Sequence, residues 1–193
     1  MTFKLGLTGS IGMGKSTTAS MFAERGCAVW DADEAVHRLY AAGGAAVAPL
    51  GARFPNAIEK GAVSRPALRR LIDADPDALS EIESIVHPLV RNDRARFAEE
   101  TGAPVAVFDI PLLFETGSDV EMDATACVDV SRETQAERVL ARGTMTRAQF
   151  EAIRAKQLPN EEKCARADFV IDTTSLESAA RDVQAVLDQI GRF

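Results

Sequence analysis

One stretch decides the fold of this chain: Gly9-Ser10-Ile11-Gly12-Met13-Gly14-Lys15-Ser16. It fits the pattern G-x-x-x-x-G-K-[ST], follows a short apolar segment at 3–7, and precedes a segment with helical spacing of apolar residues. Glycines permit a tight loop whose backbone N–H groups point inward at phosphate oxygens, and the helix N-terminus adds a partial positive charge. The sequence therefore predicts a strand, a phosphate-binding P-loop and a helix.

The P-loop predicts the contacts of a bound triphosphate. We expect ATP to lie against all residues from Gly9 to Thr17. Lys15 reaches the β- and γ-phosphates, and Ser16 ligates the Mg²⁺ that bridges them. The alternative is a glycine turn of purely structural importance, which the flanking strand and helix disfavour.

Five short apolar segments predict the sheet, and they lie at 3–7, 27–30, 105–108, 126–130 and 169–171. Each is nearly continuous in hydrophobicity, which is typical of strands buried on both faces of a parallel sheet. The predicted fold is therefore α/β, a three-layer P-loop NTPase core with a five-stranded parallel sheet.

Two helical excursions interrupt this core. Residues 34–103 form an inserted helical segment, with loops around Gly43-Gly44 and at 49–61, and residues 132–160 form a helical pair. The nucleotide-binding core is then left with three pieces, which are residues 1–33, 104–131 and 161–193.

Local signals mark several helix ends. Asp75 and Pro76 predict a helix start, as N-cap and first helical residue, and Ser131 predicts another N-cap. Thr146 and Gln149 form a capping-box pattern. Pro159 is expected to close the helix that follows.

Asp31 and Asp33 follow the second predicted strand, at the sheet edge where open α/β proteins bind ligands. A carboxylate there could take the proton of an acceptor hydroxyl during phosphoryl transfer. It could equally cap the helix that begins near Glu34. One Asp could cap while the other catalyses, and the residues alone leave this open.

Further charged residues suggest a closing lid and a metal contact. Arginines on the helical pair could cover the P-loop, neutralise phosphoryl charge and exclude water, although surface arginines are often only solvated. These arginines are Arg132, Arg138, Arg142, Arg147 and Arg154. Asp109 ends the third predicted strand and is a candidate for holding Mg²⁺ through water.

Composition excludes several classes of function. A net charge of -7 disfavours a nucleic-acid partner, and no apolar stretch is long enough for a membrane span. The three cysteines lack disulfide or zinc spacing, so we interpret them as buried or incidental thiols in a cytoplasmic protein without a signal peptide. The two histidines, His37 and His87, show no metal-site pattern, and His87 is expected in the core.

The order of the motifs resembles that of the dephospho-CoA kinase family over nearly the whole chain. The matching segments are GLTGSIGMGKST at 6–17, WDAD at 30–33, HPLV at 87–90, DIPLLFE at 109–115, Arg138 to Arg142 with Arg154 and Gln157, and ADFVIDT at 167–173. The resemblance implies ATP-dependent phosphorylation of the ribose 3'-hydroxyl of dephospho-CoA, with Mg²⁺. It also implies that 34–103 binds the CoA substrate and that 132–160 is a lid.

The resemblance assigns roles to particular residues. Asp33 becomes the general base, Lys15 a phosphate contact, Arg142 a lid arginine on the ATP phosphates, and His87 part of the acceptor-side wall. The family commonly has Asn after VID, whereas this chain has Thr173, which puts a side-chain contact to adenine in doubt.

Other functions remain as alternatives. Another P-loop kinase, acting on a nucleoside monophosphate or a sugar acid, would share the loop, base and lid, but the long insertion suits a larger acceptor. A GTPase lacks support because the chain has no N-K-x-D and because Asp109, at the end of the third predicted strand, is followed by Ile-Pro-Leu and not by the rest of a D-x-x-G motif. A nucleotide-binding regulatory module would need neither a base nor a lid. The sequence is compatible with a monomer or a small homo-oligomer.

Overall fold

A computed structural model describes residues 2–191 and divides the chain into two compact units. The nucleotide unit comprises the residues up to Trp30 together with those from Thr101 onward, and the helical unit comprises Asp31–Glu100. Each unit buries its own cluster of apolar side chains.

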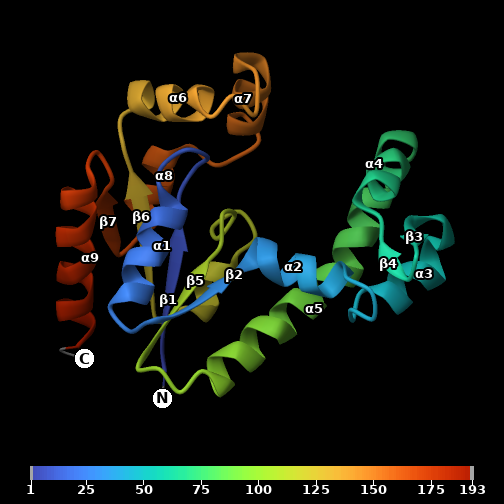
Figure 1. The fold of residues 1–193 in the computed structure, drawn as a ribbon, viewed down its shortest axis with the longest axis horizontal. Coiled ribbons are helices and arrows are strands. Elements are labelled where there is room, and N and C mark those ends of the chain that lie inside the picture. The colour runs from blue at the N-terminus through green and yellow to red at the C-terminus, as the bar shows by residue number, and fades with distance from the viewer. Residues whose placement is uncertain (1, 192–193) are drawn as a thin grey trace. The chain divides into compact units, whose positions relative to one another are not determined.

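The nucleotide unit is built on a five-stranded sheet of order β2-β5-β1-β6-β7 (Figure 1). The strands are β1 (Phe3–Thr8), β2 (Ala28–Asp31), β5 (Val105–Asp109), β6 (Ala124–Asp129) and β7 (Phe169–Asp172). The central strand β1 pairs in parallel with β5 and β6, and β6 pairs in parallel with β7. The predicted five-stranded parallel sheet is confirmed, with each strand within two residues of its expected start.

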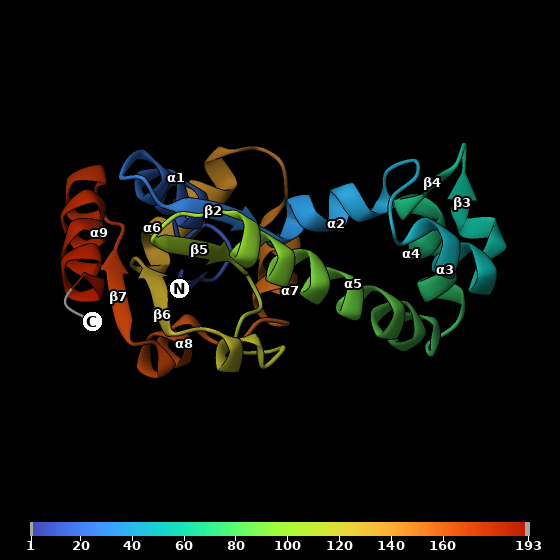
Figure 2. The ribbon, with the colours of Figure 1, turned by 90° about the horizontal axis from the view of Figure 1, so that it is seen from below.

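Helices cover both faces of this sheet. They are α1 (Lys15–Glu24), α6 (Arg132–Ala141), α7 (Arg147–Arg154), α8 (Asn160–Arg166) and α9 (Leu176–Ile190), with a short 3-10 helix at Ser118–Glu121. The strands lie between α1 and α8 in Figure 2, and α9 packs against both β7 and α1. The core holds fully buried residues from the strands and from the helices, including Leu5, Leu7, Phe22, Val128, Ile171 and Val183.

The capping residues near α6 and α7 behave as predicted. Ser131 accepts a hydrogen bond from the Thr134 N–H at the start of α6. Thr146 and Gln149 form a reciprocal capping box at the start of α7. These caps satisfy N–H groups that have no partner inside the helix, which is why their spacing was readable from the sequence.

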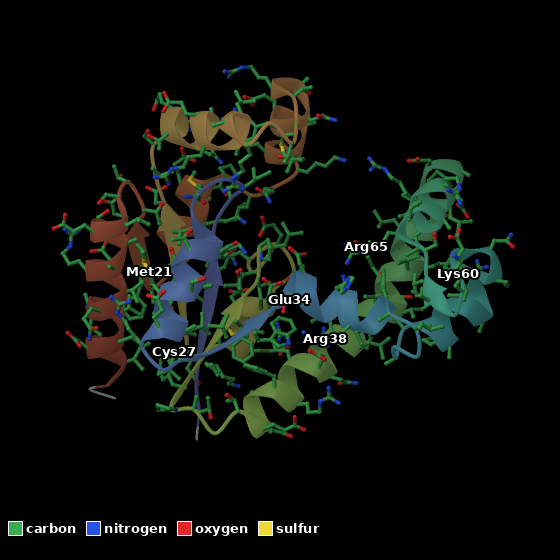
Figure 3. The ribbon with its side chains drawn as sticks, in the orientation of Figure 1. Met21, Cys27, Glu34, Arg38, Lys60 and Arg65 are labelled. Carbon is green, nitrogen blue, oxygen red and sulfur yellow. The ribbon has the colours of Figure 1, made fainter. Side chains whose placement is uncertain are left out.

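The helical unit contains four helices and a small hairpin in the described chain. Its elements are α2 (Ala32–Tyr40), α3 (Val47–Arg53), a 3-10 helix (Pro55–Ala57), β3 (Ile58–Glu59), β4 (Ala62–Val63), α4 (Arg65–Ala74) and α5 (Ala78–Glu100). Figure 3 shows Glu34 and Arg38 on α2, and the Arg38 guanidinium donates to Asp93 on α5 at 2.8 Å. The α2–α5 contact therefore includes an ion pair as well as apolar packing.

Three boundary predictions were wrong, each at a proline. Residues 49–61 are not a loop, since α3 continues through Pro49, which sits in the first turn where a backbone N–H needs no helical partner. Helix α5 begins at Ala78 and not at Pro76, and the Asp75 carboxylate accepts from the Asp77 N–H in the turn that precedes the helix. Pro159 does not close α7, which ends at Arg154; it is the N-cap of α8.

None of the helices within residues 2–191 combines the length and apolar character that a membrane-crossing helix needs.

Candidate functional site

The P-loop connects β1 to α1 and requires glycine at several positions. Gly12 and Gly14 have φ values of 80° and 89°, which side chains rarely adopt. A Cβ on Gly9 would lie 2.3 Å from Val128 Cγ2, and one on Gly12 would lie 2.4 Å from Val139 Cγ2. The loop is therefore both conformationally constrained and closely packed against β6 and α6.

Side chains from the far end of the chain hold the first half of the loop. The Ser10 N–H donates to Asn160 Oδ1 at 2.9 Å, and the Ile11 N–H donates to Gln157 Oε1 at 3.2 Å. Gln135 Nε2 donates to the Ile11 carbonyl at 2.7 Å. Because the N–H groups of Ser10 and Ile11 already have protein partners, this half of the loop is held in place by the surrounding protein, and its predicted contacts with ATP stay a prediction.

The second half of the loop leads into the N-terminus of α1. The Thr18 N–H donates to the Gly14 carbonyl at 3.1 Å, so the N–H groups of Lys15, Ser16 and Thr17 precede the hydrogen-bonded part of the helix. Such N–H groups, together with the helix dipole, favour an anion. This half is thus the part of the loop suited to phosphate oxygens.

Thr173 lies beneath the loop. Its hydroxyl lies 2.6 Å from the Met13 carbonyl and 3.0 Å from the Asp129 carbonyl, and its backbone N–H donates to the same Asp129 carbonyl at 2.9 Å. The residue is only 6% exposed. The structure therefore places the residue whose adenine contact was in doubt in a supporting position, where its hydroxyl fixes the loop.

Lys15 and Asp109 are brought together by the parallel β1–β5 pair. The Lys15 ammonium donates to Asp109 Oδ1 in an ion pair, and Asp109 is 2% exposed. Charge-assisted hydrogen bonds of this kind are strong when water is excluded. Lys15 is thus positioned at the loop before any phosphate arrives.

The oxygen groups at this place fit Mg²⁺. Ser16 presents an exposed hydroxyl in the first turn of α1, and Asp109 supplies carboxylate oxygens at the end of β5. Among residues 2–191, no group of three or more His, Cys, Asp or Glu side chains is arranged to hold a metal ion. Mg²⁺ is commonly held by one or two protein oxygens together with substrate phosphates, and this donor set matches that pattern.

The α6–α7 segment carries the arginines, and Figure 1 shows it beyond the carboxyl end of β6. Arg138 donates to the carbonyls of Thr173 and Thr174 at 2.8 and 3.1 Å, while Arg132 and Arg154 pair with glutamates. Arg142 is exposed at the C-cap of α6. Arg147, the first residue of α7, is exposed as well, so the set divides into three members that pair within the protein and two further exposed members, Arg142 and Arg147.

A cleft of about 320 Å³ lies between the loop and this segment. Its lining includes Ser10, Met13, Gln135, Arg154, Gln157 and Leu158. The residues that scaffold the loop therefore also form part of a cavity wall.

The two aspartates at the end of β2 and the start of α2 have different surroundings. Asp31 is the N-cap of α2 and its Oδ1 accepts from the Glu34 N–H at 2.9 Å. Asp33 lies in the first turn of α2 and is exposed. The capping role thus belongs to Asp31, and the Asp33 carboxylate is left for another use.

His87 does not lie in the core as its apolar neighbours suggested. Ile82 and Val86 of α5 are buried, four residues apart on one stripe, whereas His87 is exposed one position farther round the helix. The prediction of a core histidine was wrong because the stripe is narrower than the sequence pattern implied.

A buried lysine behind the loop was not predicted. Lys163 is fully buried on α8, where its ammonium donates to the Pro111 carbonyl at 2.8 Å and pairs with Glu115 at 2.9 Å. Glu115 also accepts from the Leu158 N–H. Burial alone would raise the pKa of Glu115, but the hydrogen bonds from Lys163 and Leu158 outweigh it and lower that pKa.

These supporting residues had little signal in the sequence. Gln157 belonged to a quoted motif without a role, and Asn160 and Lys163 lie on the short helix α8, which was not predicted. Lys163 pairs with Glu115, which lies 48 positions earlier in the chain. Asn160 accepts from Ser10, which lies 150 positions earlier. Pairings of this separation leave no local pattern.

Comparison with known proteins gives a consistent result. A family model described as Dephospho-CoA kinase matches residues 3–178. The dephospho-CoA kinase of Ruegeria pomeroyi is 65% identical over 190 residues, covering 98% of this chain and 96% of the relative. That of a Jannaschia species is 51% identical over 191 residues, covering 98% of both chains.

Solved structures show the same fold. A crystal structure from Thermus thermophilus superposes with a TM-score of 0.86 at 34% identity and 97% coverage of each chain. A dephospho-CoA kinase from Campylobacter jejuni gives a TM-score of 0.71 at 22% identity, covering all of this chain and 98% of its own. A shikimate kinase from Acinetobacter baumannii shares the fold more distantly, with a TM-score of 0.53 at 15% identity, covering 98% of this chain and 93% of its own.

Proposed function

The chain belongs to the dephospho-CoA kinase family, and on this premise we propose that it transfers the γ-phosphoryl group of ATP to the ribose 3'-hydroxyl of dephospho-CoA. The products are coenzyme A and ADP. The residue assignment rests on the difference in contacts between two neighbouring carboxylates. Asp31 is occupied as the cap of α2, so the exposed Asp33 is the one available as a base.

The reaction requires the acceptor hydroxyl to lose its proton as the phosphoryl group moves. In this proposal Asp33 accepts that proton. Lys15 and the N–H groups at the start of α1 bind the phosphates, and Arg142 adds positive charge to the transferring phosphoryl oxygens. In the loose transition state of phosphoryl transfer, negative charge spreads over the equatorial oxygens. The positive groups named here would stabilise that charge.

Mg²⁺ belongs to the proposal as a partner of ATP. Ser16 would ligate it directly and Asp109 through water. The ion would supply positive charge that neutralises charge developing on the phosphates. The Lys15–Asp109 pair would then rearrange, since Lys15 gains phosphate as a second anionic partner.

The parts of the chain take separate roles in this proposal. Residues 34–103 bind the CoA-type acceptor, with His87 on the acceptor side, and residues 132–160 close as a lid over ATP. The exposed position of His87 on α5 supports a role in contacting a ligand rather than in packing. A cytoplasmic location remains a prediction from the sequence.

A coupled assay for ADP formation tests the function. Dephospho-CoA, AMP and gluconate are offered separately as acceptors, and the product from dephospho-CoA is identified by mass spectrometry. We expect acceptor-dependent ADP only with dephospho-CoA, and a product that is coenzyme A. Equal turnover with AMP would instead assign the chain to the nucleoside monophosphate alternative, and no acceptor-dependent turnover would contradict a kinase.

A further inference from the structure

Two of the three cysteines meet in the nucleotide unit although the sequence suggested unrelated thiols. Cys127 on β6 and Cys164 on α8 lie 37 positions apart in the chain, with their sulfur atoms at 3.3 Å. All three cysteines are free thiols and Cys127 is buried, in agreement with the interpretation as buried or incidental thiols. That interpretation did not anticipate that two of them meet, because the strand–helix contact that joins them is not visible in their spacing.

The two sulfur atoms are close enough for a small movement to join them. A disulfide holds its sulfurs at about 2.05 Å, so the pair must close by roughly 1.3 Å. Strand β6 and helix α8 already pack against each other, so the movement needed is confined to one contact within the unit. The third cysteine, Cys27, precedes β2 and is drawn with Met21 near the end of α1 in Figure 3.

The two sulfurs differ in access and in acidity. Cys127 is fully buried, whereas Cys164 is partly exposed. The pKa of Cys164 is lowered chiefly because the Cys127 thiol can donate a hydrogen bond to its thiolate, although burial acts in the opposite direction. The same hydrogen bond and burial raise the pKa of Cys127. Cys164 is thus the sulfur suited to attack an oxidant. Cys127 is the thiol placed to resolve the product because its sulfur lies 3.3 Å away.

We propose that Cys127 and Cys164 form a reversible redox-modification site whose substrate is a hydroperoxide. The Cys164 thiolate attacks the distal peroxide oxygen, breaking the O–O bond, so that a sulfenic acid forms and hydroxide (or the alkoxide) leaves. The Cys127 thiol then attacks the Cys164 sulfur, forming the disulfide, and the sulfenic oxygen leaves as water with the thiol proton. In sum two thiols are oxidised by two electrons and the peroxide is reduced.

Asn160 connects this site to the P-loop. It lies one turn before Cys164 on α8, with Nδ2 3.6 Å from the Cys164 sulfur and Oδ1 3.8 Å from the Cys127 sulfur. The same Oδ1 accepts from the Ser10 N–H. Closing the disulfide draws α8 toward β6 and displaces Asn160, so oxidation should loosen the first half of the loop and weaken nucleotide binding.

Mass spectrometry of the full chain tests the site independently of kinase activity. The reduced protein is treated with hydrogen peroxide, quenched with iodoacetamide and analysed intact and by peptide mapping. We expect a product lighter by two hydrogens, a Cys127–Cys164 cross-link, and one remaining alkylated cysteine, Cys27, since the chain has three cysteines and two are joined. Dithiothreitol should restore all three thiols.

Cysteine variants give matched controls. Cys27→Ala should still form the cross-link, whereas Cys164→Ala should lose it and leave Cys127 unreactive toward peroxide. Because Cys164 is partly exposed on a helix, its alanine variant is expected to fold, which circular dichroism and thermal melting check. Cys127→Ala should accumulate sulfenic acid at Cys164, detected with dimedone.

Several results would overturn the proposal. These are three alkylatable thiols after peroxide treatment, over-oxidation of Cys164 without closure, or a cross-link through Cys27. Equilibrium dialysis with ATP tests the connection to the loop, and we expect the oxidised chain to bind up to about tenfold more weakly, the change that loss of one buried hydrogen bond allows. Unchanged affinity of a fully cross-linked sample would disprove the link through Asn160.

Discussion

Replacing Thr173 by Val tests whether the far end of the chain supports the P-loop. The substitution keeps the branched shape of the side chain and removes only its hydroxyl, which lies 2.6 Å from the Met13 carbonyl. The Asp129 carbonyl, the second neighbour of the hydroxyl, keeps its bond from the Thr173 backbone N–H at 2.9 Å. The change therefore acts mainly on one carbonyl of the loop.

The size of the effect follows from burial. Thr173 is 6% exposed, so water cannot readily replace the lost partner, and a buried acceptor left without one costs about 1–3 kcal/mol. Thr174→Val is the matched control, because it removes the neighbouring hydroxyl, which donates to Asp172 at 2.6 Å but is exposed. Solvent can take over that bond, and the control should cost less than about 1 kcal/mol.

Urea unfolding of the ligand-free protein measures both variants. Trp30, the single tryptophan, is buried in β2 and reports on unfolding through its fluorescence. We expect Thr173→Val to lower the free energy of unfolding more than Thr174→Val does, and to raise the KM for ATP. If the two variants differ by less than about 0.5 kcal/mol, the assignment of Thr173 as a loop support is refuted.

Three further predictions concern charged residues of the site. Asp33→Asn should lower turnover by roughly 10²–10⁴-fold without changing ATP affinity, as expected for loss of a general base. Asp31→Asn should keep both turnover and ATP affinity, because Asn also caps helices. Equal losses of turnover in steady-state assays of the two variants would reject the assignment of Asp33 as the base. Lys15→Ala should weaken ATP binding, measured by calorimetry, and also slow turnover; loss of only one would contradict its dual role. Glu115 has a lowered pKa in the folded protein, so its contribution to stability is present above the unfolded pKa of about 4.3 and lost as the pH falls below it. The destabilisation caused by Glu115→Gln in urea unfolding should therefore be seen at pH 7 and shrink toward pH 3, and a pH-independent difference would argue against the pair with Lys163.

The elements with local signals could be predicted from the sequence. The P-loop was recognisable because its glycines and its lysine lie within eight consecutive residues, 9–16. The caps of α6 and α7 were recognisable because a cap and its N–H partner are three residues apart. The five strands were found because burial on both faces makes each a continuous apolar run.

Prolines and pairs of similar residues limited the prediction. Pro49 and Pro159 were interpreted as breaks, but a proline at the start of a helix needs no N–H partner, so both mark beginnings. The sequence could not distinguish Asp31 from Asp33, because either residue lies close enough to the start of the predicted helix to cap it. Only the hydrogen bond from the Glu34 N–H distinguishes them.

The residues that support the P-loop could not be predicted, because they lie far from it along the chain, and the same separation affects how the site forms. Ser10, Ile11 and Met13 are held by side chains that lie 150, 146 and 160 positions later in the chain. The second half of the loop depends on the N-terminus of α1, which is local, but the shape of the first half depends on α8 and the end of β7 being docked. A nucleotide site of this kind is completed only when the C-terminal part of the unit has folded, since long-range contacts require prior loop closure. By the same dependence, the proposed closure of the Cys127–Cys164 pair on α8 would change the phosphate-binding loop, which Asn160 contacts.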